Sequence, residues 1–442
     1  MLYPETIQFL FGLRLFGAQF GLETTFQLAA LAGHPQNRLR FIHVAGTNGK
    51  GSTCAMLESI YRHVGLRVGL FTSPHLVSFR ERIQVNRRWM GEDEVVRLVQ
   101  ELQPLLKQFP DGHHPTFFEV VTVMALKFFA EQHCDLVIWE TGLGGRLDAT
   151  NIVTPLASVI TNIQFDHEQW LGDTLAKIAG EKADIIKPGV PVITAVNEPE
   201  ALKVIEEVAR KQNAPLVMVD GRDAALRRPD SAARCPYLSL AGDHQQLNAA
   251  LSLAAVGALQ KQIPVTAEAI HAGLQNVNWP GRLQLVTLPD NRRILLDGAH
   301  NVAGVKALCD ALKKNFPAGK RTLVLGVLQD KDWRHICEML APLSARIFTV
   351  PVSSERSTPP GELTAACRAA NPAAEIFTCA SLREVLEKIA RDDFVVITGS
   401  LYLVGEALEL LGLSPSARDE RGLNEWTAGA LPPRPADKLS PR

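Results

Sequence analysis

The chain has 442 residues with 46 basic against 47 acidic side chains, and 46% of its residues are hydrophobic. This length allows two or three domains with substantial cores, and the composition is ordinary for a soluble globular protein. A net charge of −1 provides no broad basic field, so nucleic acid is not an expected partner. The seven cysteines are scattered, without a Cys-x-x-Cys pair, which disfavours a disulfide framework or a zinc site and favours reduced thiols.

The start of the chain and its apolar runs give no membrane signal. Glu5 and Arg14 interrupt the first apolar residues, so a signal peptide is not expected. No apolar run reaches the roughly 18 residues that a membrane helix needs. We therefore expect a cytoplasmic protein with no membrane partner.

Short apolar runs alternate with helix-like stretches through the first part of the chain. Each run is apolar at successive positions, as in strands that are buried on both faces of a parallel sheet. The stretches between them, such as 52–64 and 118–129, repeat apolar residues at helical spacing. The expected strands are Phe41–Ala45, Val68–Phe71, Leu136–Trp139, Ala157–Thr161 and Val190–Ala195. The alternation predicts a doubly wound α/β domain over residues 1–288.

A second α/β series begins after the turn Leu288–Asn291. Its expected strands are Ile294–Leu296, Thr322–Leu325, Ile347–Val350, Ile376–Phe377 and Phe394–Ile397. Helical stretches such as 302–313 and 382–390 separate them, which predicts a smaller, Rossmann-like α/β domain over residues 292–413. Residues 414–442 are rich in proline, alanine and charge, and we expect them to form a flexible tail.

The strongest local pattern is the glycine-rich stretch Gly46–Ser52, which follows the first expected strand and begins a helix. Glycines let backbone N–H groups approach phosphate oxygens, and the helix N-terminus and Lys50 add positive charge. The hydroxyl of Ser52 or Thr53 would lie near a metal ion. The pattern therefore predicts a P-loop that binds nucleotide phosphates, with an ordinary glycine-rich turn as the alternative. Only two residues separate its first two glycines, unlike the common G-x-x-x-x-G-K-[ST] loop.

Polar side chains also follow three other expected strands. Ser73 comes after the second strand, Glu140 ends the third, and Asp166-His167 follows the fourth. The carboxyl edge of a parallel sheet is where such proteins bind ligands, and oxygen donors suit magnesium. Taken singly, Ser73 could cap a turn, Glu140 could be a solvated strand end, and His167 could be structural. Together they favour a metal site at this edge.

A set of segments, in order from residue 38 to residue 405, resembles the folylpolyglutamate synthase family of the Mur ligase superfamily. They are Gly46–Ser52, Ser73–Leu76, Phe117–Glu119, Glu140–Asn151, Asp166-His167, Gly180–Lys187, Pro280–Arg282, Asp297–Asn301 and Thr398–Leu403. The sequence Gly-Thr-Asn-Gly-Lys is that of the phosphate loop in these ATP-dependent amide ligases. The additional Gly51 is similar to the folate branch.

The resemblance implies roles for individual residues. The expected ATP contacts are Thr47, Asn48, Gly49, Lys50, Gly51, Ser52, Asn248, Arg282 and Asp297. The expected ligands of two Mg²⁺ ions are Ser73, Glu140, His167 and Lys182, the last as a carbamate. The alternative for Lys182 is a free amine on an exposed helix. The expected substrate contacts are Thr116, Phe117, Phe118, Glu119, Leu147, Asp148, Ala149 and Ser400.

The implied activity is ATP-dependent joining of L-glutamate to dihydropteroate and to tetrahydrofolate through an acyl phosphate. Lys50 would act on the transferred phosphate, Lys182 would act through its carbamate, and His300 or an acidic neighbour would accept the proton of the glutamate amine. The stretch 145–151 resembles bifunctional members, and a monofunctional folylpolyglutamate synthase is the alternative. Phe117 and Phe118 would either stack on a pterin ring or belong to the core. A monomer is expected.

Two other functions compete with this one. A muramyl peptide ligase would use the same loop and second domain, but no UDP-binding domain is recognisable before the loop, which begins at residue 46. A regulatory P-loop protein would bind nucleotide without glutamate-dependent turnover. The Asp297–Asn301 segment and the second domain argue against that alternative.

Overall fold

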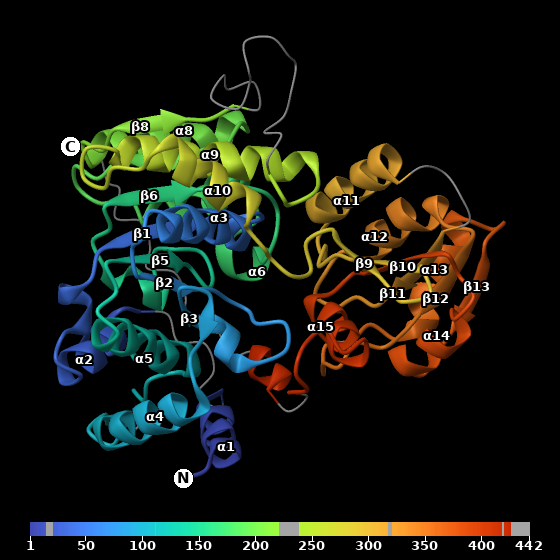
Figure 1. Cartoon of the computed structure of the whole chain (residues 1–442), viewed down its shortest axis with the longest axis horizontal. Helices are drawn as coiled ribbons and strands as arrows, with labels where there is room; N and C mark the ends of the chain where they lie inside the picture. Colours follow the sequence, from blue (N-terminus) through green and yellow to red (C-terminus); the bar gives the residue numbers. More distant parts are fainter. Residues whose placement is uncertain (15–20, 111, 221–237, 317–320, 418–419, 426–442) are drawn as a thin grey trace.

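The computed structural model describes residues 1–14, 21–110, 112–220, 238–316, 321–417 and 420–425. Two α/β units lie side by side, the first coloured blue to yellow-green and the second orange to red in Figure 1. Within the described part of the chain, no helix is both long and apolar enough to cross a bilayer.

The first unit is built on an eight-stranded sheet in the order β4-β3-β2-β5-β1-β6-β7-β8. Its strands are β1 (Phe41–Ala45), β2 (Val68–Phe71), β3 (Ile83–Val85), β4 (Arg88–Trp89), β5 (Leu136–Glu140), β6 (Ala157–Ile160), β7 (Val192–Thr194) and β8 (Leu216–Met218). The strands from β2 to β8 in this order run parallel, while β3 and β4 extend one edge in antiparallel pairs. The five expected strands are present, with ends that differ by at most two residues.

Helices cover both faces of this sheet because its strands are apolar on both sides. In β1, Phe41 and Ala45 point to one face, and Ile42 and Val44 to the other. The helices are α1 (Tyr3–Leu13), α2 (Glu23–Leu31), α3 (Lys50–His63), α4 (Glu92–Leu106), α5 (Phe117–Glu131), α6 (Glu168–Leu171), α7 (Leu175–Ala183), α8 (Pro199–Lys211), α9 (Asp243–Leu259) and α10 (Ala267–Gln275). Helices α3, α9 and α10 cover the Ile42 face, and α1, α2, α4, α5, α7 and α8 cover the Phe41 face.

The second unit has a six-stranded sheet in the order β13-β12-β11-β14-β10-β9, parallel except for β9. Its elements are β9 (Gln284–Thr287), β10 (Arg293–Leu296), α11 (Val302–Asn315), β11 (Thr322–Leu325), α12 (Trp333–Leu340), β12 (Arg346–Thr349), α13 (Pro360–Ala370), β13 (Glu375–Thr378), α14 (Leu382–Lys388), β14 (Phe394–Thr398) and α15 (Leu401–Leu410). Because β9 pairs with β10, the second sheet begins at Gln284, before the turn at which the sequence placed the boundary.

The C-terminal residues depart from the expected tail. Residues 426–442 lie outside the described residues, but 420–425 form a short 3-10 helix, η7 (Arg421–Asn424), that returns to the first unit. Figure 1 shows this red segment beside the blue elements. The expectation of a flexible tail is therefore wrong for Glu420–Glu425, because its polar groups find specific buried partners in the first unit.

One close contact on the Ile42 face yields a stability prediction. A Cβ on Gly273 of α10 would lie 2.6 Å from Ile60 Cα of α3, so Gly273→Ala must push the two helices apart. We expect a loss of about 1–3 kcal/mol, seen as a lower thermal midpoint. Gly257→Ala on α9 is the control, since a Cβ there meets nothing within 4 Å. An unchanged midpoint for Gly273→Ala would contradict the prediction.

Candidate active site

The phosphate loop lies between β1 and α3, and two of its glycines are required by their surroundings. A Cβ on Gly46, at φ 145°, would lie 1.8 Å from Thr161 Oγ1, and one on Gly49, at φ 84°, would lie 2.4 Å from Asn248 Oδ1. The Asn48 N–H donates to Asn162 Oδ1 at 2.8 Å, and the Thr161 hydroxyl donates to the Asn48 carbonyl at 2.6 Å. The loop thus takes its shape from the residues that follow β6.

Two lysines converge on one carbonyl of this loop. Lys50 Nζ donates to the Gly46 oxygen at 3.1 Å, and Lys182 Nζ, from α7, donates to the same oxygen at 2.9 Å. Lys182 is only 4% exposed, which excludes the alternative of an exposed helix lysine. Burial, and then the charge of Lys50, lowers the pKa of Lys182 to about 7. A large fraction of this buried amine is therefore neutral near pH 7.

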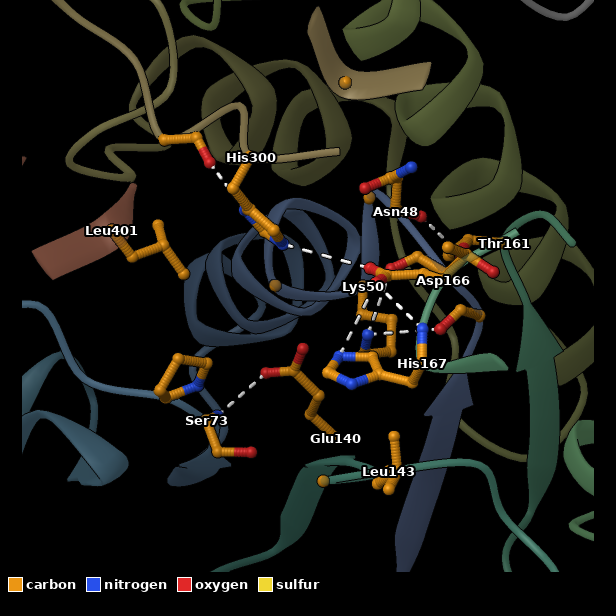
Figure 2. A pocket seen from close by; sticks show the side chains of 18 of the residues that line it. Asn48, Lys50, Ser73, Glu140, Leu143, Thr161, Asp166, His167, His300 and Leu401 are labelled. Carbon is orange, nitrogen blue, oxygen red and sulfur yellow. Dashed lines mark hydrogen bonds and ion pairs between the residues drawn. The ribbon is translucent and has the colours of Figure 1, made fainter. Parts of the chain in front are cut away.

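The carboxylate at the end of β5 lies close to this pair. Glu140 is 4% exposed, and its Oε2 accepts a hydrogen bond from the Ser73 N–H at 3.1 Å. Burial raises the pKa of Glu140 to about 7, although Lys50 and the Ser73 N–H act to lower it. Figure 2 shows Glu140, His167 and Lys50 beside one another at the cavity.

A buried ion pair joins the two units at Asp166. Lys331, in the loop after β11, places its Nζ 2.6 Å from Asp166 Oδ1, and the two side chains are 7% and 9% exposed. Asn301 Nδ2 donates to Asp166 Oδ2 at 3.0 Å. Burial acts to raise the pKa of Asp166, but His167, Lys331 and His300 outweigh it and hold this pKa below its usual range.

Both histidines of this cluster are neutral near pH 7. Burial and the charge of Lys331 lower the pKa of His167 to about 3 and that of His300 to about 4. The Nδ1 of His300 lies 2.8 Å from the Gly298 carbonyl, so Nδ1 carries the proton, and Nε2, which lies 4.0 Å from Asp166 Oδ2, is left without one. Lys331 is therefore the permanent positive partner of Asp166.

Of the nucleotide contacts expected outside the loop, Asn248 lies beside α3, while Arg282 and Asp297 flank the strands β9 and β10. Asn248 Nδ2 donates to Gln245 Oε1 at 3.0 Å, and Gln245 Nε2 donates to Ser52 Oγ at 3.2 Å. Asp297 is fixed by the N–H groups of Leu283 and Ala299, at 2.8 and 3.0 Å. The charge of Asp297 acts to raise the pKa of Arg282, but burial outweighs it and lowers that pKa.

The expected substrate residues also line this cavity. Glu119 closes the N-terminus of α5, where its Oε2 accepts from the Thr116 N–H and hydroxyl, each at 2.8 Å. Thr25 donates to Glu119 Oε1 at 2.9 Å, so this carboxylate is occupied by structural hydrogen bonds. Asp148 is likewise held by the Leu143 N–H at 2.7 Å. Phe117 is 9% exposed and packs on Phe79, and Phe118 is less buried.

All the residues predicted from the sequence to act on nucleotide, metal or substrate line one cavity of about 660 Å³. It receives the carboxyl ends of strands from both sheets: the loops after β1, β2, β5 and β6 on one side and after β10, β11 and β14 on the other. Sequence reasoning missed other lining residues, namely Arg14, Arg82, Lys331, Arg356, Tyr402, Asn424 and Glu425. For Lys331, its position after a strand was an available signal.

Comparison with known families defines the class. The Mur ligase middle domain matches residues 44–256, and the Mur ligase glutamate ligase domain matches residues 281–401. The fold and the site are those of a Mur-type ATP-dependent ligase.

Individual relatives identify the family within this class of ligases. Dihydrofolate synthase/folylpolyglutamate synthase of Bacillus subtilis (strain 168) is 37% identical over 422 residues, which cover 91% of this chain and 98% of the relative. A crystal structure of folylpolyglutamate synthase from Thermotoga maritima superposes with a TM-score of 0.83 at 33% identity, covering 95% of this chain and 98% of that one. E. coli FolC in complex with DHPP and ADP gives 0.80 at 29% identity, with 93% and 98% covered. The chain belongs to the folylpolyglutamate synthase/dihydrofolate synthase family.

Proposed function

We propose that this protein uses ATP to join L-glutamate to dihydropteroate and to tetrahydrofolate. One observation carries the proposal. The phosphate loop, the N-terminus of α5, the loop after β5 and residues of the second unit all line the same cavity. The names of the relatives support both acceptors, and the E. coli complex with DHPP and ADP supports a site that takes a nucleotide together with a second ligand.

The chemistry follows from what amide formation requires. An acceptor carboxylate reacts poorly with an amine because its oxygen is a poor leaving group. Its oxygen therefore attacks the γ-phosphorus of ATP, the bond to ADP breaks, and an acyl phosphate forms. The neutral glutamate amine attacks the acyl carbon, phosphate leaves, and the proton that the amine loses passes to the departing phosphate. Lys50 and the loop N–H groups stabilise the charge on the transferred phosphoryl group.

The donor groups of the site fit Mg²⁺ bound together with a nucleotide. The described residues hold no group of three or more His, Cys, Asp or Glu side chains that could bind a metal. Mg²⁺ usually takes one or two carboxylates and completes its shell with phosphate oxygens and waters. Glu140 offers such a buried carboxylate, with Ser73 and the neutral His167 beside the same cavity. When bound, Mg²⁺ would neutralise phosphate charge there.

Carbamylation of Lys182 forms part of the proposal. A neutral amine adds to carbon dioxide and releases a proton, which gives a carbamate with a negative charge. Lys182 is buried, it lies beside the positive Lys50, and its amine is largely neutral above pH 7. A carbamate there would place a negative charge beside Lys50, which attracts it, and would offer an oxygen ligand for a second Mg²⁺.

His300 serves the incoming amine in this proposal. A pKa of about 4 makes its imidazole a weak base, so Nε2 is better suited to accept a hydrogen bond from the glutamate amine than to store its proton. Ser400, the 1% exposed N-cap residue of α15, lines the same side.

The test is phosphate release from ATP by the purified protein with Mg²⁺ and L-glutamate. Release with dihydropteroate and with tetrahydrofolate is the expected result. Release with tetrahydrofolate alone would make the enzyme monofunctional. Nucleotide binding without release for either acceptor would contradict the proposal and favour a regulatory P-loop protein.

Phe118 gives a prediction on the acceptor side. Its ring lines the cavity and lies 6.0 Å from the ring of Phe71, so one face can stack on a pterin. Phe118→Ala is expected to raise the KM of the acceptor about tenfold while the KM of ATP changes less than about twofold. Steady-state kinetics check this, with Phe26→Ala, an exposed phenylalanine of α2, as the control. An unchanged acceptor KM would show that Phe118 has only a structural role.

A further inference from the structure

Residues Glu420–Glu425, which we call the C-terminal clasp, are buried against the loop that follows β2. Glu420, Leu423 and Asn424 are 8%, 2% and 7% exposed. Polar side chains tolerate such burial only when their hydrogen bonds are made within the protein. The partners of the clasp therefore show what it holds.

Glu420 binds the loop through side chain and backbone. Its Oε2 accepts hydrogen bonds from Ser78 Oγ at 2.8 Å and from the Phe79 N–H at 2.6 Å. Its main-chain oxygen lies 3.0 Å from His75 Nε2. These three contacts join positions more than 340 residues apart in the sequence.

Asn424 binds the same loop from its other side. Its Oδ1 accepts from Arg82 Nη2 at 2.6 Å, and its Nδ2 donates to the His75 carbonyl at 3.0 Å. Arg82 Nε in turn lies 2.9 Å from His75 Nδ1. Because a guanidinium has only donors, Nδ1 must accept, and the ring proton lies on Nε2, which donates to Glu420. The clasp thus fixes one tautomer and one orientation of His75.

The loop that the C-terminal clasp binds also carries Ser73. Ser73 is separated from His75 by one residue and donates through its N–H to Glu140. Ser73, Arg82, Asn424 and Glu425 all line the cavity. A displacement of His75 would therefore move Ser73 away from Glu140 and open the wall of the cavity on this side.

We propose that the C-terminal clasp positions the Ser73–Arg82 loop for the ligase reaction, with Glu420 and Asn424 as positioning residues. The inference rests on the proposed function for its kinetic consequence, but the contact itself can be tested without turnover. Neither residue touches the reacting groups in this assignment. Their effect passes through His75 to Ser73 and Glu140.

The test compares Glu420→Ala and Asn424→Ala with Glu387→Ala, which removes an exposed carboxylate of α14. Hydrogen exchange followed by mass spectrometry is measured on the full-length proteins. In both clasp variants a peptide covering residues 72–82 is expected to exchange about tenfold faster or more, while peptides from α3 and α9 keep their rates. The control is expected to match the unsubstituted protein.

Kinetics give the second readout. With dihydropteroate as acceptor, kcat is expected to fall about tenfold or more in both alanine variants, while the KM of ATP changes less than about threefold. Glu420→Gln keeps an oxygen acceptor for Ser78 and Phe79 and is expected to restore most of kcat.

Three results would overturn the proposal: unchanged exchange over residues 72–82, unchanged kcat despite faster exchange there, or equally faster exchange throughout the protein, which would mean general destabilisation. If the unsubstituted protein shows no glutamate-dependent turnover, the proposed function fails. The exchange data then still decide whether the clasp holds the loop.

Discussion

Replacing Lys182 by alanine is expected to lower the rate of glutamate ligation about a thousandfold. The side chain is buried at the loop carbonyl that also binds Lys50, so alanine removes a group from the centre of the phosphate site. If the carbamate is the active form, added short carboxylates are expected to restore part of the rate in Lys182→Ala. The measurement is phosphate release with both acceptors.

The control for Lys182 lies on the same helix. Lys177 of α7 forms an exposed ion pair with Asp173, and such pairs contribute little to stability, so Lys177→Ala should keep its activity. The carbamate itself can be observed by carbon-13 NMR after labelling with bicarbonate, as a signal that Lys182→Ala lacks. Turnover like that of the unsubstituted protein in Lys182→Ala would end its catalytic assignment.

The second large effect is expected from Lys331→Met. This change leaves Asp166 buried without its permanent counter-charge, and breaking a buried pair in this way costs about 3–5 kcal/mol. Because the pair joins the two units, its loss destabilises the arrangement of the units that brings glutamate to the phosphate loop. We expect kcat/KM for glutamate to fall about a hundredfold or more, while the thermal midpoint of each unit changes little.

A double-mutant cycle separates this coupling from simple loss of a lysine. Asp166→Asn removes the charge that Lys331 neutralises, so the double variant should lose less than the sum of the two single losses. Lys306→Ala, which breaks an exposed pair with Asp310 in the second unit, serves as the control. Strict additivity would show that Lys331 acts without Asp166.

Most of the fold, and the parts of the site that are contiguous in the sequence, could be predicted from the sequence. Runs such as Phe41–Ala45 carry apolar residues on both alternating sets of positions, as in a strand with both faces covered, so the doubly wound first unit could be predicted. The phosphate loop is local, and Ser73, Glu140 and His167 follow strands whose carboxyl ends share an edge. The strands β4, β8 and β9 escaped prediction because they lie at sheet edges and are partly exposed, and Gln84 interrupts the apolar residues of β3.

What could not be predicted depends on contacts between distant residues. Lys331 and Asp166 are 165 positions apart, and although each follows a strand, neither sequence context shows that the two side chains form a pair. The clasp has the composition of a tail, and its burial follows from partners in the first unit. Glu119 shows the converse, since a residue that resemblance assigns to substrate also completes the capping of α5.

The amide pair between Asn48 and Asn301 has a thermodynamic consequence. Asn301 Nδ2 donates to Asn48 Oδ1 at 3.0 Å, and Asn301 also caps α11 by accepting from the Gly304 N–H at 2.8 Å. A nucleotide that orders Asn48 in this pose favours the same arrangement that brings α11 and His300 to the cavity. Linkage requires the influence to be mutual, so glutamate must tighten nucleotide binding by the factor by which nucleotide tightens glutamate binding.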